Sequence, residues 1–187
     1  MSRASLRQGI TIEHRGCASS GGTARRAPDM IVRVPDLTSE VRPIDFNESA
    51  TGLNDVLSAA PGWTDQRFED DVAVHGEIYR HGTDVFFSGW LAANVKCACP
   101  RCLDEFSWPM KRDFTFLIAK AQPGQEFEDD MGLDHYDSDD LDLGRLAREQ
   151  ALLALDASVL CSETCRGLCA GCGVNLNLES CTCGRTH

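Results

Sequence analysis

Six of the ten cysteines fall within residues 161–187, and this cluster constrains the fold of the chain more than any other feature. Cysteines at such density are cross-linked as disulfides in secreted proteins, or bind metal in the reducing cytosol. Residues 1–29 contain arginines but lack the apolar stretch of roughly 7–15 residues that a secretory signal requires. We therefore expect a cytoplasmic protein whose thiols are free to bind a metal.

The spacing of the terminal cysteines is typical of a zinc knuckle. Cys169 and Cys172 have the two-residue gap that brings two sulfurs to one ion, and Gly173 suits the positive φ that such a turn demands. Cys181 and Cys183 offer two more thiolates. Four thiolates complete the tetrahedral coordination of zinc, so the pattern predicts a structural site with no open position for chemistry.

A second set of four cysteines has comparable spacing. Cys99 and Cys102 share the two-residue gap, and Cys161 and Cys165 follow a predicted helix. Two four-sulfur zinc sites are one interpretation, with Cys99, Cys102, Cys161 and Cys165 in one and the four terminal cysteines in the other. A single site that draws two ligands from each region is also feasible, because cysteines distant in sequence often meet in space.

The remaining cysteines and the histidines fit simpler roles. Cys17 and Cys97 have no partner at knuckle spacing and are expected to be small buried side chains. His187 could replace one thiolate, although a terminal histidine is more often exposed. The other histidines expected at the surface are His75, His81 and His135. None belongs to a recognisable catalytic motif, so we expect a protein that is not an enzyme and has no small-molecule substrate.

Charge divides the chain into a basic tail and an acidic body. Residues 1–29 hold five arginines against Glu13 and Asp29, a local charge of +3, so residues 30–187 carry −14 and the whole chain −11. The tail has no apolar periodicity and is expected to be disordered. An acidic body repels phosphates, so contact with RNA would need a basic protein partner or a local patch. No apolar run approaches the roughly 20 residues that span a bilayer, which predicts a soluble protein without a membrane partner.

Alternating apolar residues from 69 to 120 predict β-structure. Val72, Val74 and Ile78 lead to a turn at 81–84, and a second strand continues to Val95, which together indicate an antiparallel hairpin. Large residues from Phe106 to Ile118 predict a third strand, with Pro109 at a bulge or an edge.

A helix and an acidic segment complete the predicted organisation. Asp142 can cap a helix over residues 143–156, whose apolar stripe should pack on the sheet. Residues 126–142 contain nine acidic side chains and are expected to form a solvated loop, whose spacing does not match a calcium-binding loop. The expected fold is α+β, a small antiparallel sheet packed by a helix over residues 30–160, followed by a cysteine-rich zinc knuckle over 161–187.

Two motifs follow one another along the chain. They are Cys99-Pro-Arg-Cys102-Leu103 after a predicted strand, and Cys165-Arg-Gly-Leu-Cys169-Ala-Gly-Cys172-Gly-Val-Asn-Leu-Asn177 with Cys181-Thr-Cys183. In this order they resemble the motifs of the YceD-like family, the large ribosomal RNA subunit accumulation proteins. The resemblance covers about residues 30–187. It implies a non-enzymatic bacterial factor that supports synthesis or assembly of the large ribosomal subunit, and a precursor of that subunit, its RNA or a basic ribosomal protein as partner.

Five residues near the two motifs are candidates for partner contacts: Arg101, Leu103, Lys111, Arg112 and Arg166. Ordinary solvated charge is an equal alternative for the four cations among them. Two other functions share the same cysteine chemistry. One is a zinc-ribbon adaptor that binds the transcription machinery, and the other is a thiol-based sensor of oxidants or zinc.

Overall fold

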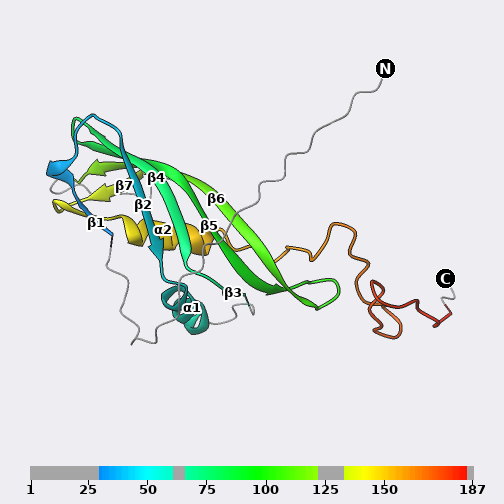
Figure 1. The fold of residues 1–187 in the computed structure, drawn as a ribbon. Helices are drawn as coiled ribbons and strands as arrows, with labels where there is room; N and C mark the ends of the chain where they lie inside the picture. The colour runs from blue at the N-terminus through cyan, green and yellow to red at the C-terminus, as the bar shows by residue number, and fades with distance from the viewer. Residues whose placement is uncertain (1–29, 61–65, 122–132, 185–187) are drawn as a thin grey trace, which may run out of the picture.

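The computed structural model describes residues 30–60, 66–121 and 133–184 (Figure 1). The predicted tail over 1–29, with Cys17, and the terminal His187 lie outside these ranges. The elements follow the chain in this order: β1 (Ile31–Arg33), a 3₁₀ turn (Val34–Asp36), β2 (Arg42–Glu48), α1 (Ala50–Ala59), β3 (Arg67–Phe68), β4 (Val72–His81), β5 (Asp84–Ala98), β6 (Glu105–Lys120), β7 (Leu133–Tyr136), β8 (Asp140–Asp142) and α2 (Leu143–Leu153). This is the predicted α+β fold.

The main sheet has the strand order β2-β4-β5-β6-β7, with the short β3 paired to β5. The predicted hairpin is confirmed: β4 and β5 pair antiparallel from Ala73 with Ala92 to His81 with Asp84. Gly82 begins the two-residue turn with φ +63°, a conformation that glycine adopts without strain. β5 and β6 then pair without interruption from Val85 with Ile118 to Ala98 with Glu105, so this hairpin ends at the first cysteine motif.

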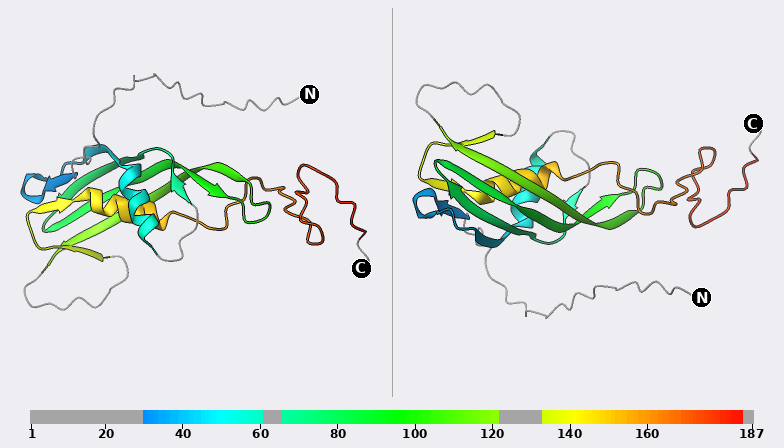
Figure 2. Two further views of the ribbon diagram at one scale, coloured as in Figure 1. Left: turned by 90° about the horizontal axis from the view of Figure 1, so that it is seen from below. Right: turned by 90° about the horizontal axis from the view of Figure 1, so that it is seen from above.

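Both helices cover one face of the main sheet (Figure 2). Residues on that face alternate with residues on the other, and the buried ones include Val74, Leu91 and Phe114, none more than 6% exposed. Gly76 and Gly89 are paired on this face, and a Cβ at Gly76 would come within 2.9 Å of the Phe87 ring. Gly76 therefore makes room for the Phe87 ring, and Gly89 allows the β4 backbone at His75 and Gly76 to approach closely.

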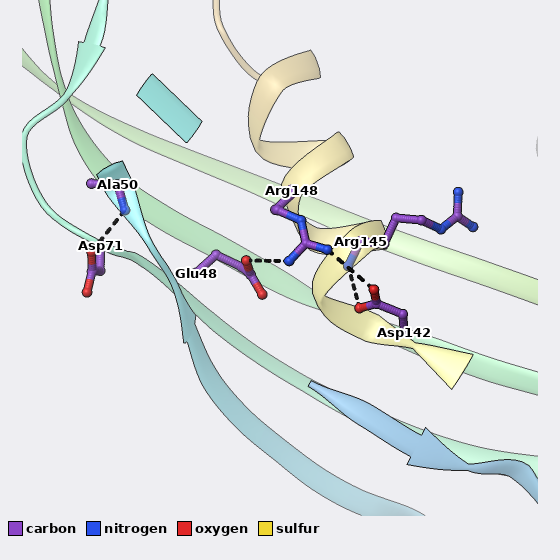
Figure 3. Close-up of polar contacts among 6 residues, drawn as sticks. All are labelled: Glu48, Ala50, Asp71, Asp142, Arg145 and Arg148. Carbon is purple, nitrogen blue, oxygen red and sulfur yellow. Dashed lines mark hydrogen bonds and ion pairs between the residues drawn. The ribbon is translucent and has the colours of Figure 1, made fainter. Parts of the chain in front are cut away.

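The predicted cap of α2 is confirmed. The Asp142 side chain accepts a hydrogen bond of 2.8 Å from the Arg145 backbone N–H (Figure 3). The helix ends at Leu153, three residues before the predicted end. Arg148, one turn further along, donates to Glu48 of β2 at 2.9 Å and to Asp142 at 3.3 Å, which ties the helix to the edge strand. Glu48 is 5% exposed, so this ion pair is partly shielded from water.

The prediction of a solvated loop over residues 126–142 was wrong for residues 133–136 and 140–142, and residues 126–132 lie outside the described ranges. Residues 133–136 form β7, which pairs parallel with β6, and residues 140–142 form β8, which pairs with β1. Tyr136 is buried and its hydroxyl donates to the Thr83 carbonyl at 2.7 Å, while Leu141 is 6% exposed. A few apolar side chains among the carboxylates therefore anchor the segment, and the main sheet is mixed instead of purely antiparallel.

Neither helix of the described chain is long and apolar enough to cross a membrane.

Candidate metal centres

The first centre, formed by Cys99, Cys102, Cys161 and Cys165, lies at the end of the β5–β6 hairpin. The Cys99 and Cys165 sulfurs are 3.8 Å apart, and those of Cys102 and Cys161 are 3.6 Å apart. Four ligands at roughly 2.3 Å around one tetrahedral ion lie about 3.8 Å from one another. These two distances match that spacing, and all four sulfurs lie within 4.8 Å of one another, so the cluster fits a single metal ion. Three of these cysteines are buried, and Cys161 is exposed.

The second centre consists of Cys169, Cys172, Cys181 and Cys183. Their closest sulfur pairs are 2.7 to 3.5 Å apart, the shortest being Cys181 with Cys183. These sulfurs would move outward by up to about 1 Å to reach tetrahedral spacing around a metal. Only Cys169 is buried here, so this centre is more open to solvent than the first.

The two knuckle turns share one backbone hydrogen-bond pattern. In the first, the Leu103 N–H donates to the Cys99 carbonyl at 2.8 Å, and the Cys99 N–H donates to the Asp104 carbonyl at 2.9 Å. In the second, Gly173 donates to Cys169 and Cys169 donates to Val174, both at 2.8 Å. The repeat explains why two short motifs of different composition present their sulfurs in the same way.

The fourth position after the first cysteine distinguishes the two turns. Both residues there have positive φ, +63° at Leu103 and +74° at Gly173. Glycine adopts this conformation freely, whereas leucine is disfavoured in it by about 1 kcal/mol. Leu103 is also 65% exposed, so burial does not offset the strain. The first knuckle turn therefore holds an exposed leucine in a strained conformation beside the metal centre.

Two asparagines join the centres. Asn175 Nδ2 donates to the Asp104 carboxylate at 2.7 Å, which links the second knuckle to the first. Asn177 Nδ2 lies 3.4 Å from the Cys165 sulfur, while its Oδ1 accepts from the Arg166 N–H at 2.7 Å. The spacing of the cysteines gave no signal for these contacts, although both asparagines stand in the second of the two family-like motifs.

Backbone N–H groups prepare one sulfur of each centre for metal binding. Burial acts to raise the pKa of Cys99, but N–H groups of Cys161, Cys102 and Arg101 outweigh it and lower the pKa to about 6. The Cys172 N–H, with help from Cys181 and Gly171, lowers the pKa of Cys169 to about 6 as well.

A second sulfur in each centre resists ionisation. At Cys102 the Asp104 N–H favours the thiolate, but burial and the neighbouring thiols outweigh it and raise the pKa to about 12. At Cys183 the Cys181 thiol raises the pKa to about 12. Four thiolates repel one another, so a cation is needed before all four ionise together.

The structure separates the candidate partner-binding residues. Arg101 donates to the Cys165 carbonyl at 3.2 Å, which gives it a role in holding the first centre. Arg112 donates to Gln150 of α2 at 3.1 Å, on the helix-covered face. Lys111 lies on the opposite face, 4.6 Å from the centre of the Trp90 ring. Leu103 and Arg166 are exposed beside the two knuckles.

The arrangement has the chemistry of two closed metal sites. Each cluster brings its four sulfurs within 4.8 Å of one another, in the partition that favours two sites over one shared site. Cys97 lies outside both clusters and is 3% exposed within β5.

Comparison with known proteins places these features in a family. The family model described as large ribosomal RNA subunit accumulation protein YceD matches residues 87–187, which hold both centres, most of β5, all of β6, and α2. The large ribosomal RNA subunit accumulation protein YCED homolog 1, chloroplastic, of Arabidopsis thaliana is 35% identical over 46 residues. That alignment covers 25% of this chain and 14% of the relative. No solved structure matches. Because the family model spans more than half of its length, this chain belongs to the YceD family.

Proposed function

We propose that this protein is a non-enzymatic factor that supports accumulation of large-subunit ribosomal RNA during assembly of the large ribosomal subunit. The observation that carries the proposal is the family match, which spans both four-cysteine centres and the hairpin that supports them. The role would place the chain where ribosomes are made, in the cytoplasm if the chain is bacterial.

Zinc is the metal that we propose for both centres. Tetrahedral sets of four thiolates are characteristic of zinc or iron, and zinc needs no redox partner. Its four thiolates leave no open coordination position, which supports a structural role. Residues 161–184 contain no regular helix or strand, and few of their side chains are buried. Metal binding would therefore supply folding energy that apolar packing does not.

The partner that we propose is a precursor of the large subunit, contacted through its RNA or a basic ribosomal protein. The charge of −14 over residues 30–187 favours the protein contact over direct binding to phosphate. Leu103 supports a surface near the first centre as one point of contact, because it is exposed in a strained conformation.

Depletion of the protein in its own organism tests the proposal. We expect less large-subunit RNA relative to small-subunit RNA, and precursor particles in sucrose gradients, both reversed by the wild-type gene. Cys102→Ser and Cys183→Ser should restore less than wild type, whereas Cys97→Ala, a buried cysteine outside the centres, serves as the matched control. Unchanged RNA levels and particle profiles after depletion would overturn the proposal.

A thiol-based sensor is a second candidate, favoured by the exposure of Cys172 and Cys183 in the second centre. This role requires rapid zinc release at physiological peroxide concentrations together with altered partner binding.

A third alternative is the zinc-ribbon adaptor of transcription, and capture of partners from cell extract tests it. Ribosomal proteins are expected for the assembly factor, and polymerase subunits for an adaptor of transcription.

A further inference from the structure

The face of the main sheet opposite the helices is covered by no described element, as the right-hand view of Figure 2 shows. We call this surface the open face. Pairing across the strands defines its rows, which run through Trp90, through Ser88 and through Phe86 on β5. The Trp90 row continues to His75 and Asp45 on one side and to Asp113 on the other.

Aromatic rings occupy two rows of the open face. His75 and Trp90 have ring centres 4.3 Å apart, and Tyr79 stacks on Phe86 with centres 5.0 Å apart and planes 5° from parallel. Trp90, Tyr79 and Phe86 are half-buried, and none of them packs against the core cluster. These rings are held in place by neighbours on the sheet and keep one side toward solvent.

Carboxylates surround the rings. Asp45, Glu77 and Asp113 are all exposed on the open face, and the Asp45 carboxylate is 2.6 Å from His75 Nδ1. Among the described residues, neither Glu77 nor Asp113 has an ion-pair partner. The Lys111 ammonium already makes a cation–π contact with the Trp90 ring. A cation from a binding partner would compete with Lys111 for this ring.

The distribution of charge selects between two kinds of partner. Exposed aromatic residues on a sheet stack equally well on nucleic-acid bases or on arginine guanidinium groups. Nucleic acid also requires cations along its phosphates, whereas this face presents three carboxylates around its rings. Arginine and lysine side chains can stack on the rings and also form ion pairs with the carboxylates.

We propose that the open face binds an extended, Arg- and Lys-rich segment of a partner protein. Trp90 and Phe86 are four residues apart on β5, a distance of about 13 Å along a strand. Two basic residues separated by three others would reach both aromatic rows, with Glu77 between them. This inference rests on the proposed function for its biological setting, because proteins that bind ribosomal RNA carry clusters of basic residues.

Binding of a fluorescent, unstructured 15-residue peptide with arginines at that spacing tests the inference on the full zinc-loaded chain. Trp90→Ala should weaken binding roughly tenfold, because it removes the ring and its apolar contact. Glu77→Gln with Asp113→Asn should weaken it roughly five- to tenfold at low salt and reduce its salt dependence. The matched control neutralises Asp55 and Glu149, which are exposed on α1 and α2, and should leave affinity nearly unchanged.

Lys111→Gln distinguishes a basic peptide from an RNA as the ligand of the open face. It should strengthen peptide binding severalfold, because it removes a competing cation from Trp90, whereas it would weaken binding to an RNA. Preference for a single-stranded oligonucleotide over the peptide, self-association through this face, or peptide binding insensitive to Trp90 and the two carboxylates would each overturn the inference. Such results would leave the proposed function standing if depletion still lowers large-subunit RNA. A loss of that RNA phenotype alongside intact peptide binding would instead refute the proposed function alone.

Discussion

Replacing Leu103 by glycine should leave folding stability unchanged or raise it, although it removes a large apolar side chain. Leu103 has a φ of +63° and is 65% exposed, so the native state loses little buried area in the variant. Relief of the left-handed strain contributes about 1 kcal/mol in favour of the variant. The greater freedom of glycine in the unfolded chain costs about 0.5–1 kcal/mol. The two terms give a net change between roughly zero and +0.5 kcal/mol.

Two other variants calibrate this comparison. Gly173 has a φ of +74°, and a Cβ added there would meet nothing within 4 Å, so Gly173→Ala makes the reverse exchange without a clash. It adds about 1 kcal/mol of strain and removes about 0.5–1 kcal/mol of freedom from the unfolded chain, so it should lower the free energy of unfolding by roughly zero to 0.5 kcal/mol. Leu178 is 78% exposed without positive φ, so Leu178→Gly should show the cost of glycine alone.

Urea unfolding at matched zinc content measures all three free energies of unfolding. A loss of more than about 1 kcal/mol in Leu103→Gly would show that Leu103 packs against the fold, and would refute the argument from strain. We expect the same variant to support less accumulation of large-subunit RNA than wild type, since the exposed leucine is proposed to contact a partner.

The remaining predictions concern the metal centres and the helix contact. Metal analysis should find about two zinc ions per chain, and Cys102→Ser or Cys183→Ser should each remove about one of them. Asn177→Ala should weaken metal binding at the first centre by roughly tenfold or more, because it removes the side chain that contacts the Cys165 sulfur. In the folded, metal-free chain the pKa values of Cys99 and Cys169 are lowered from 9.0 to about 6. Their ionisation therefore stabilises the fold fully above pH 9, and this contribution to the free energy of unfolding declines as the pH falls to 6. At pH 7 each centre already holds one thiolate, so calorimetry in buffers of different ionisation enthalpy should show about three protons released per metal, and release of four would contradict these pKa values. Arg148→Met should lower the free energy of unfolding by about 2 kcal/mol, because the ion pair with the buried Glu48 is lost; a change below about 0.5 kcal/mol would show that the pair contributes little.

Local patterns predicted the elements whose structure depends on near neighbours. The alternation around Val74 and Leu91 gave the β4–β5 hairpin, and Asp142 gave the start of α2, because strand pairing across a tight turn and helix capping are short-range effects. The cysteine spacing likewise gave the two pairs with two-residue gaps. The spacing could not decide which pairs share a centre, because Cys99 meets Cys165 only after β5, β6 and α2 have packed.

Long-range contacts account for what the sequence did not predict. β2 and α1 had no sequence prediction, and α1 lacks a side-chain cap at Ser49; Asp71, distant in sequence, instead accepts from the Ala50 N–H at 2.9 Å (Figure 3). The parallel pairing of β7 with β6 depends on the packing of Tyr136 beneath the β4–β5 turn, which outweighs the acidity of the segment around it. The asparagine contacts between the centres are long-range in the same way.

Pro109 interrupts the backbone donors along one edge of β6. β7 pairs with β6 only from Leu117 onward, so among the described strands the rest of that edge of β6 has no neighbour. Asn94 of β5 lies opposite Pro109, but its N–H donates to the Asp70 carboxylate and its carbonyl accepts from the Glu69 N–H. Asn94 and Pro109 therefore make no hydrogen bond across the hairpin, and the proline nitrogen faces the open edge of β6. A missing donor there, followed by the charged Lys111, Arg112 and Asp113, denies an incoming strand a continuous template. The same proline that fits within the hairpin thus breaks the row of hydrogen-bonding groups that edge-to-edge pairing of two chains requires.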